Sequence, residues 1–286
     1  MMEDIKIDST EMSDLEGSSA FSDSSAKYTK KGGSNSVYPD PVADQLLSLY
    51  NSLGLANNES LKYAVLASPI ASIAVFYVCF SSSTSALISF IAWNFSIIFM
   101  LVSFWILCEI LLKDQGPRAM QEIAEVIREG SEGFFITQYG TIFKYAFMTA
   151  LGLFVMYAMR EIPAQSNLNN YFSPLSMAVI TSISFLMGSI CSAIAGYSGI
   201  WVSVRANLRV AAASRKCYND AIQICFRGGA FAAIINVALA IFGISSLYLA
   251  FIFYFYMIGA ENPPIEEIPA LIVGFGFGAS FVAMFA

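Results

Sequence analysis

The 286-residue sequence contains no histidine. Imidazole acid–base catalysis, histidine-containing zinc sites and histidine proton relays are therefore excluded within this chain. Charged residues are also scarce, at 13% of the sequence against 57% hydrophobic, whereas a soluble domain carries about 25% charged residues. Beyond residue 44 the only aspartates are Asp114 and Asp220. The composition predicts an integral membrane protein that is poor in the carboxylates that metal-dependent chemistry requires.

The five cysteines show neither the paired spacing of a disulfide framework nor the spacing of a metal site, so we interpret them as free thiols. The chain opens MMEDIKIDSTEMSDLEGSS, without the basic start and immediate apolar run of a secretory signal peptide. No cleavable signal is predicted. The cysteines are Cys79, Cys108, Cys191, Cys217 and Cys225.

The apolar stretches predict an all-α, polytopic transmembrane helix bundle, because a helix needs roughly 20 apolar residues to cross the hydrocarbon core. Two of the predicted spans are longer than the core requires and must tilt or project into water. Ser173 and Pro174 form a plausible helix start, and Gly259 followed by Pro263 and Pro264 a plausible stop and restart. We predict six spans, near 63–81, 87–112, 134–159, 174–204, 228–258 and 268–286.

Two domains are expected. Residues 1–60 are predicted to be a cytoplasmic and mostly disordered N-terminal tail, because the first 40 residues are rich in Ser, Gly and charge. Within that tail, residues 41–55 have a partly helical apolar rhythm, which favours a helix lying on a membrane surface. Residues 61–286 are predicted to be the helix bundle, truncated at its C-terminal end.

The distribution of basic residues predicts the orientation, because Lys and Arg are retained on the cytoplasmic side. In the six-span scheme one membrane face holds nine basic residues and the opposite face only Arg160. The N-terminus and Ala286 are therefore both expected to be cytoplasmic. The nine are Lys62, Lys113, Arg118, Arg128, Arg205, Arg209, Arg215, Lys216 and Arg227.

Small residues recur every fourth position within two spans, and such stripes let helix backbones approach closely in lipid. We expect these stripes to pack helices rather than to bind an ion. They are Gly188, Ser192 and Gly196, and Ala270, Gly274 and Gly278.

Few ionisable or amide groups fall inside the spans. Glu109 and Lys113, four residues apart, are expected to pair at the cytoplasmic end of the second span. Lys144 is expected to snorkel along its helix, with a specific partner as the alternative. Asn236 is expected to form an interhelical hydrogen bond rather than to bind a transported ion.

The segment 116–142 reads GPRAMQEIAEVIREGSEGFFITQYGTI. Its apolar stripe, Met120, Ile123, Ile127 and Phe134, predicts an interfacial helix. Further on, GYSGIWVSVRANLRVAAASR at 196–215 leaves the membrane on the cytoplasmic side. Arg205 and Arg209 in it are four residues apart, and lipid phosphates, cytosolic loops and an anionic substrate all remain candidate partners.

These two segments, together with FRGGAFAAIINVALAIFGI at 226–244 and LIVGFGFGASFVAMFA at 271–286, closely resemble the membrane-integral, ion-translocating inorganic pyrophosphatases. The last segment resembles the potassium-independent, proton-pumping subgroup more than the potassium-dependent one. The resemblance covers most of residues 110–286 and implies that this chain is a fragment of a larger fold of roughly 16 helices.

The resemblance implies that the parent protein hydrolyses magnesium pyrophosphate at a cytoplasmic site, pumps protons or sodium ions, and is a homodimer. The likeness to the potassium-independent subgroup favours protons. The family's phosphate-binding lysines and metal-binding aspartates follow a glycine-rich turn that comes after the string matched at 271–286. We therefore assign no catalytic, cofactor-binding or metal-binding residue in this chain, and expect it to be inactive alone. Arg205, Asn207 and Arg209 match the family at the cytoplasmic end, without an assigned catalytic role.

Two other interpretations are kept. The six spans could form half of a secondary transporter or channel, although spans one to three show no repeat of spans four to six. The chain could instead be a catalytically inactive membrane subunit, which predicts a stop codon after Ala286. No nucleic-acid partner is expected.

Overall fold

The computed structural model describes residues 40–52, 84–160, 171–259 and 265–285. Within these residues the chain is helical, with one short 3₁₀ turn, η2 (Ile265–Glu267). Five helices are long and apolar enough to cross a membrane, and a shorter one, α2 (Pro41–Ser52), precedes them. The prediction of an all-α transmembrane bundle is confirmed. The first predicted span, 63–81, lies outside the described residues.

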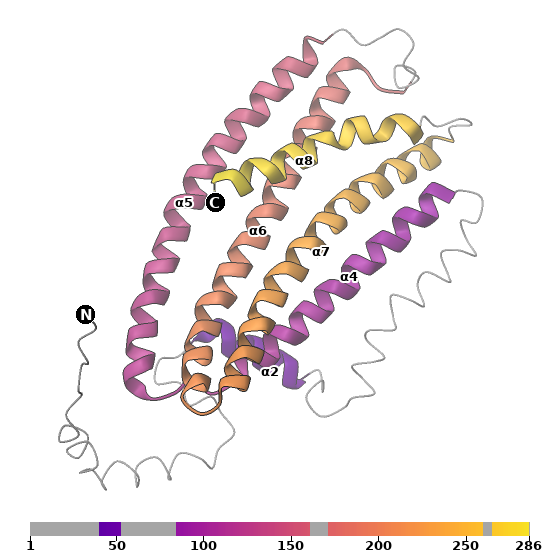
Figure 1. Cartoon of the computed structure of the whole chain (residues 1–286). Helices are drawn as coiled ribbons and strands as arrows, with labels where there is room; N and C mark the ends of the chain where they lie inside the picture. The colour runs from indigo at the N-terminus through magenta and orange to yellow at the C-terminus, as the bar shows by residue number, and fades with distance from the viewer. Residues whose placement is uncertain (1–39, 53–83, 161–170, 260–264, 286) are drawn as a thin grey trace, which may run out of the picture. The chain divides into compact units, whose positions relative to one another are not determined.

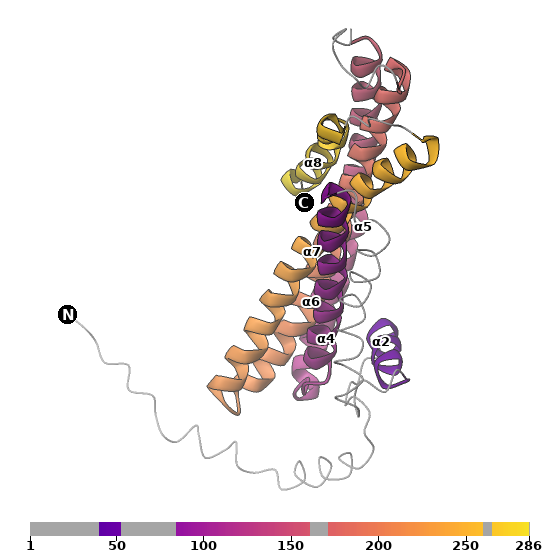
Figure 2. The ribbon, with the colours of Figure 1, turned by 90° about the vertical axis from the view of Figure 1, so that its right-hand side faces the viewer.

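The five long helices are α4 (Thr84–Leu111), α5 (Arg118–Ala158), α6 (Pro174–Ser214), α7 (Tyr218–Ile258) and α8 (Ile268–Phe285). Four of them lie side by side in the order α5, α6, α7, α4 (Figure 1). Viewed edge-on, α8 lies on one face of this layer and α2 on the other (Figure 2). The membrane-embedded part is thus one layer of long helices that carries a short helix on each face.

Three of the helices, α5, α6 and α7, have 41 residues each. At a rise of 1.5 Å per residue each is about 60 Å long, roughly twice the hydrocarbon thickness. The two longest predicted spans, 174–204 and 228–258, are therefore shorter than the helices α6 and α7 that contain them. The connections 112–117 and 215–217 lie at the same end of the layer, where the Lys216 ammonium donates to Asp114 at 2.7 Å. We call this end the arginine-rich end.

The helix boundaries follow local chemistry that the sequence displays. The hydroxyl of Ser173 caps α6 by accepting from the Ser176 amide at 3.3 Å, and Pro174 fills the first turn. At the same end of the layer, opposite the arginine-rich end, α7 stops at Gly259, whose φ of 68° is in the left-handed region that glycine tolerates best. Both predicted boundaries are confirmed, whereas Pro263 and Pro264 lie outside the described residues.

The segment 118–133 is not a separate interfacial helix, and that prediction is wrong. It continues into the following span without a break as α5 (Figure 1). Its predicted apolar stripe points away from the layer, because Ile123, Ile127 and Phe134 are all more than half exposed. Within residues 118–135 the side chains that α5 buries are Gln121 and Phe135, so the predicted stripe is not the face that packs on the layer.

The core is built mostly on α6, which contacts every other long helix. At α8 the two backbones approach closely: a Cβ added at Gly188 would overlap the Phe275 carbonyl, and one at Gly278 would overlap the Phe185 carbonyl. The Ser189 hydroxyl donates across this contact to the Gly278 carbonyl at 3.2 Å. The predicted packing role of the small residues is confirmed at Gly188, Gly274 and Gly278, while Ala270 is exposed.

Candidate functional site at the arginine-rich end

Arg205 and Arg209 are buried within the bundle, at 8% and 3% exposure, rather than turned toward lipid headgroups. One helical turn apart on α6, they point toward the elements packed at the arginine-rich end. Asn207, between them in sequence, is exposed. The sequence left lipid phosphates, cytosolic loops and an anionic substrate open as partners of the two arginines. In the described structure both arginines bind groups of the protein itself.

The Asp40 carboxylate is the partner of Arg205. Its Oδ2 accepts from Arg205 Nε at 2.6 Å and also lies 3.6 Å from Arg128 Nη1 on α5. Oδ1 accepts from the Ala43 amide at 3.4 Å, which caps the start of α2. One carboxylate therefore joins the N-terminal segment to two long helices.

Arg205 is held in place by its own helix as well. Its Nη1 donates to the Trp201 carbonyl at 3.1 Å, and its guanidinium lies 3.6 Å from the centre of the Trp201 ring. A cation over an indole face is attracted by the ring quadrupole. The guanidinium is thus held by Trp201 as well as by Asp40.

Arg209 closes the end of α4. Its Nη2 donates to the carbonyl of Leu111, the last residue of α4, at 3.1 Å, and its Nη1 donates to the Arg205 carbonyl at 2.8 Å. The carbonyls at a helix C-terminus have no partner within their own helix, and a cation there also opposes the helix dipole. The third nitrogen, Nε, is buried without a hydrogen-bond partner.

The electrostatics keep Asp40 ionised. Burial raises the pKa of its carboxyl, but the hydrogen bond and charge of Arg205, together with weaker contributions, outweigh that effect, and the net pKa is below the ordinary value of 3.8. Arg128 and the Ala43 amide act in the same direction. At neutral pH this site therefore contains a carboxylate between guanidinium groups.

α2 is fixed by apolar contacts next to these charges. Its Ala43 and Tyr50 are buried, and Leu46 and Leu47 are partly buried against α4, α6 and α7. The partners on those helices include Ile110, Val202 and Phe231. The prediction of a helix in this region is confirmed, but its apolar face packs on the bundle rather than on a membrane surface.

The other polar groups singled out from the sequence are Glu109, Lys144 and Asn236. Glu109 pairs with Arg227 of α7 at 3.0 Å, not with Lys113, so the predicted local pair is wrong. Lys144 is exposed on α5. Asn236 lines a cavity of about 220 Å³ between α6, α7 and α8, with Ser192 and Ser280 also in its wall.

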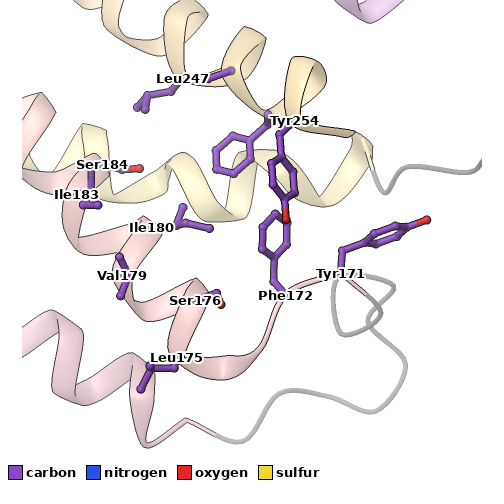
Figure 3. Close-up of a pocket in the computed structure, with 12 residues that line it drawn as sticks. Tyr171, Phe172, Leu175, Ser176, Val179, Ile180, Ile183, Ser184, Leu247 and Tyr254 are labelled. Atoms are coloured by element: carbon purple, nitrogen blue, oxygen red, sulfur yellow. The ribbon is translucent and has the colours of Figure 1, made fainter. Parts of the chain in front are cut away.

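A larger cleft lies away from the arginines, toward the start of α6. It has a volume of about 560 Å³ and is walled by α6, the residues before it, and α7. Aromatic and branched apolar side chains dominate it, with Phe172 stacked against Tyr254 at one end (Figure 3). A lining of this kind suits hydrocarbon and offers no charged group for chemistry.

The residues that the structure describes contain no group of three or more His, Cys, Asp or Glu able to hold a metal ion. The magnesium ligands implied by the resemblance are therefore not found among them. The four described cysteines, Cys108, Cys191, Cys217 and Cys225, are free thiols, as predicted.

Comparison with known families decides the identity of the chain. The family described as inorganic H+ pyrophosphatase matches residues 97–286. The chain belongs to the inorganic H+ pyrophosphatase family. The resemblance drawn from the residue strings is thus confirmed, and no solved structure matches the chain.

Curated members of the family give the same result. Pyrophosphate-energized membrane proton pump 3 of Arabidopsis thaliana is 42% identical over 74% of this chain and 26% of its own length. The K(+)-insensitive pyrophosphate-energized proton pump 2 of Moorella thermoacetica is 40% identical over 66% of this chain and 24% of its own. The K(+)-insensitive pyrophosphate-energized proton pump of Caldanaerobacter subterraneus is 38% identical over 62% of this chain and 24% of its own length. The chain spans about a quarter of the length of these relatives.

Proposed function

We propose that this chain is the N-terminal portion of a membrane pump that couples hydrolysis of pyrophosphate to proton translocation. The observation that carries the proposal is the family match over residues 97–286, which includes four complete long helices and most of α4. The relatives' names support pyrophosphate as the energy source, protons as the ion, and insensitivity to K+. The secondary transporter or channel is not favoured, because no such protein is among these relatives.

The arginine-rich end is proposed to face the cytoplasm, which places the N-terminus on the cytoplasmic side as well. The charge asymmetry supports this orientation: Arg118, Arg128, Arg215, Lys216 and Arg227 lie at or near this end, whereas Arg160 follows the opposite end of α5. The whole protein is further proposed to be a homodimer.

Mg²⁺ is proposed as the cofactor of the whole protein, with ligands outside the described residues. Bound Mg²⁺ would neutralise the pyrophosphate charge and position the attacking water. The described helices supply no such ligands. They form the layer of long helices, and their contacts at the arginine-rich end hold α2, α4, α5 and α6 together. The 286-residue chain alone is expected to hydrolyse no pyrophosphate.

The test uses the protein encoded by the complete reading frame that contains this sequence, reconstituted in sealed vesicles. Added magnesium pyrophosphate is expected to acidify the vesicle lumen with or without K+, and a proton ionophore to abolish the gradient. ATP in place of pyrophosphate is the control and should give no gradient. Hydrolysis without a proton gradient would overturn the proposed pump. A protein that neither hydrolyses pyrophosphate nor forms a gradient would support the interpretation as an inactive subunit.

A further inference from the structure

The contacts of Asp40 with the two arginines are incomplete. Guanidinium groups bind oxyanions best in a two-pronged arrangement, with two parallel N–H···O bonds. Asp40 offers only Oδ2 to both arginines, at 2.6 Å from Arg205 and 3.6 Å from Arg128, because Oδ1 is turned to the Ala43 amide. Neither guanidinium is engaged in the geometry it favours.

The charges at this place are also unbalanced. Arg128, Arg205 and Arg209 bring three positive charges, and the carboxylates of Asp40 and Glu125 bring two negative ones, so one positive charge remains. If Asp40 left, the surplus would be two, which matches the charge of about −1.5 to −2 on a phosphate group at neutral pH.

Arg209, one helical turn from Arg205, carries a buried donor without a partner. Arg209 is 3% exposed, and its Nε has no hydrogen-bond partner. The cost of leaving such a donor unpaired is large enough that native structures seldom retain one without a reason. Arg209 also lies within electrostatic reach of both Arg205 and Asp40.

We propose that Arg128, Arg205 and Arg209 form a binding site for a phosphate-class oxyanion, and that the Asp40 carboxylate fills this site when no such anion is bound. A tetrahedral oxyanion has enough oxygens to give each guanidinium its own acceptor, which the single Oδ2 of Asp40 does not. Binding of the anion displaces Asp40, removes the cap of α2, and releases α2 from α4, α6 and α7.

The choice of phosphate rests on the proposed function, since pyrophosphate hydrolysis would release orthophosphate at the face where the arginines lie. A lipid headgroup offers the same phosphate chemistry at the same depth. The proposed site would bind the product, and no step of the hydrolysis is assigned to its arginines.

The experiment measures hydrogen–deuterium exchange of residues 43–52 in the whole protein in detergent, with the magnesium chelated so that the hydrolytic site is idle. Addition of about 10 mM orthophosphate, against chloride at equal ionic strength, is expected to raise the exchange rate about tenfold as α2 undocks. An unchanged rate in both detergent and lipid would overturn the proposal.

Matched variants identify the arginines. Arg128→Gln is expected to lose the phosphate response, whereas Arg118→Gln, an exposed arginine on the same helix, should keep it. Asp40→Asn removes the competing charge, so its α2 exchanges fast without phosphate, and the protein should bind orthophosphate about tenfold more tightly by equilibrium dialysis. Equal responses in Arg128→Gln and Arg118→Gln would contradict the assignment.

Two further arms separate the possible failures. Vesicles of phosphatidylcholine alone and of phosphatidylcholine with phosphatidic acid distinguish the sources: a response to phosphatidic acid but not to free orthophosphate assigns the site to a lipid headgroup. Hydrolysis with magnesium restored is measured on the same samples. An active enzyme without any α2 response refutes only the anion site, and an inactive protein with the response refutes only the proposed function.

Discussion

The contact between α6 and α8 is predicted to be sensitive to a single methyl group at Gly278. An alanine Cβ there would overlap the Phe185 carbonyl oxygen and lie 3.0 Å from the Ser189 amide nitrogen. Both are backbone atoms of α6, so no side-chain rotation relieves the overlap, and the helices must move apart. The substitution would also weaken the Ser189 hydrogen bond to the Gly278 carbonyl.

The expected cost follows from two opposing effects. Overpacking of a close contact costs about 1–3 kcal/mol, and a backbone overlap belongs at the upper end of that range. Alanine in place of glycine returns about 1 kcal/mol of helix propensity. We expect a net loss of about 2 kcal/mol in the free energy of unfolding for Gly278→Ala, which is a roughly thirtyfold change in the equilibrium.

The assay is a dodecyl sulfate titration of the whole protein in mixed micelles, followed by tryptophan fluorescence. Gly276→Ala is the matched control, because nothing lies within 4 Å of a Cβ at that position of the same helix. The control should be neutral or slightly stabilised. Equal midpoints for Gly278→Ala and Gly276→Ala would refute the close backbone approach of α6 and α8.

Three further predictions concern other contacts of the described helices. Arg209→Gln should lower the free energy of unfolding by about 2–4 kcal/mol in the same titration, because α4 loses its buried cap. Substitution of the exposed Arg215, Arg215→Gln, should change it little. Similar losses of stability in the two variants would show that burial of Arg209 is irrelevant. Because the pKa of Asp40 is lowered on folding, its stabilisation of α2 is fully present above the ordinary value of 3.8 and is lost as the pH falls through the lower folded value. The protection of α2 against hydrogen exchange, taken relative to an unstructured peptide at the same pH, should therefore be constant from pH 7 to about 4 and fall below. An Asp40→Asn variant with the same pH profile of protection would contradict this. Gly196→Ala should destabilise, because the new Cβ meets the Tyr139 hydroxyl, and adding Tyr139→Phe should restore stability; a double mutant as unstable as Gly196→Ala would refute that contact.

The helices of the bundle were readable from the sequence because their signals are local. Long apolar runs, the Ser173 cap and the Gly259 stop each depend on residues within one or two turns. Helix length was underestimated for a related reason: where α5 and α6 leave the hydrocarbon, their composition turns polar, although the backbone remains helical. Apolar content reports the membrane boundary and not the end of the helix.

The contacts at the arginine-rich end could not be predicted in the same way. Asp40 and Arg205 are 165 residues apart, and no periodicity links them. The family resemblance drew attention to Arg205, Asn207 and Arg209, but burial of the two arginines depends on where α2 and α4 pack. Asp40 followed by Pro41 is a typical start of a helix, and this signal could have fixed where the helix predicted within residues 41–55 begins.

Glu109 shows the limit of local pairing rules. Four residues separate it from Lys113, which favours a pair on one helix, yet it binds Arg227 of α7 at 3.0 Å. The exposed Lys113 loses little by remaining in water, whereas a bond between two helices also fixes α4 against α7. Predictions from spacing alone therefore identify ionisable groups that need a partner, but not which neighbouring helix supplies it.

The central claim, that this chain is part of a pyrophosphate-driven proton pump, is tested most directly by vesicle acidification with the protein encoded by the complete reading frame. We predict a pH gradient that requires magnesium pyrophosphate, persists without K+ and collapses on addition of a proton ionophore. Vesicles in which pyrophosphate is hydrolysed but no gradient forms, or in which pyrophosphate is left intact, would contradict it.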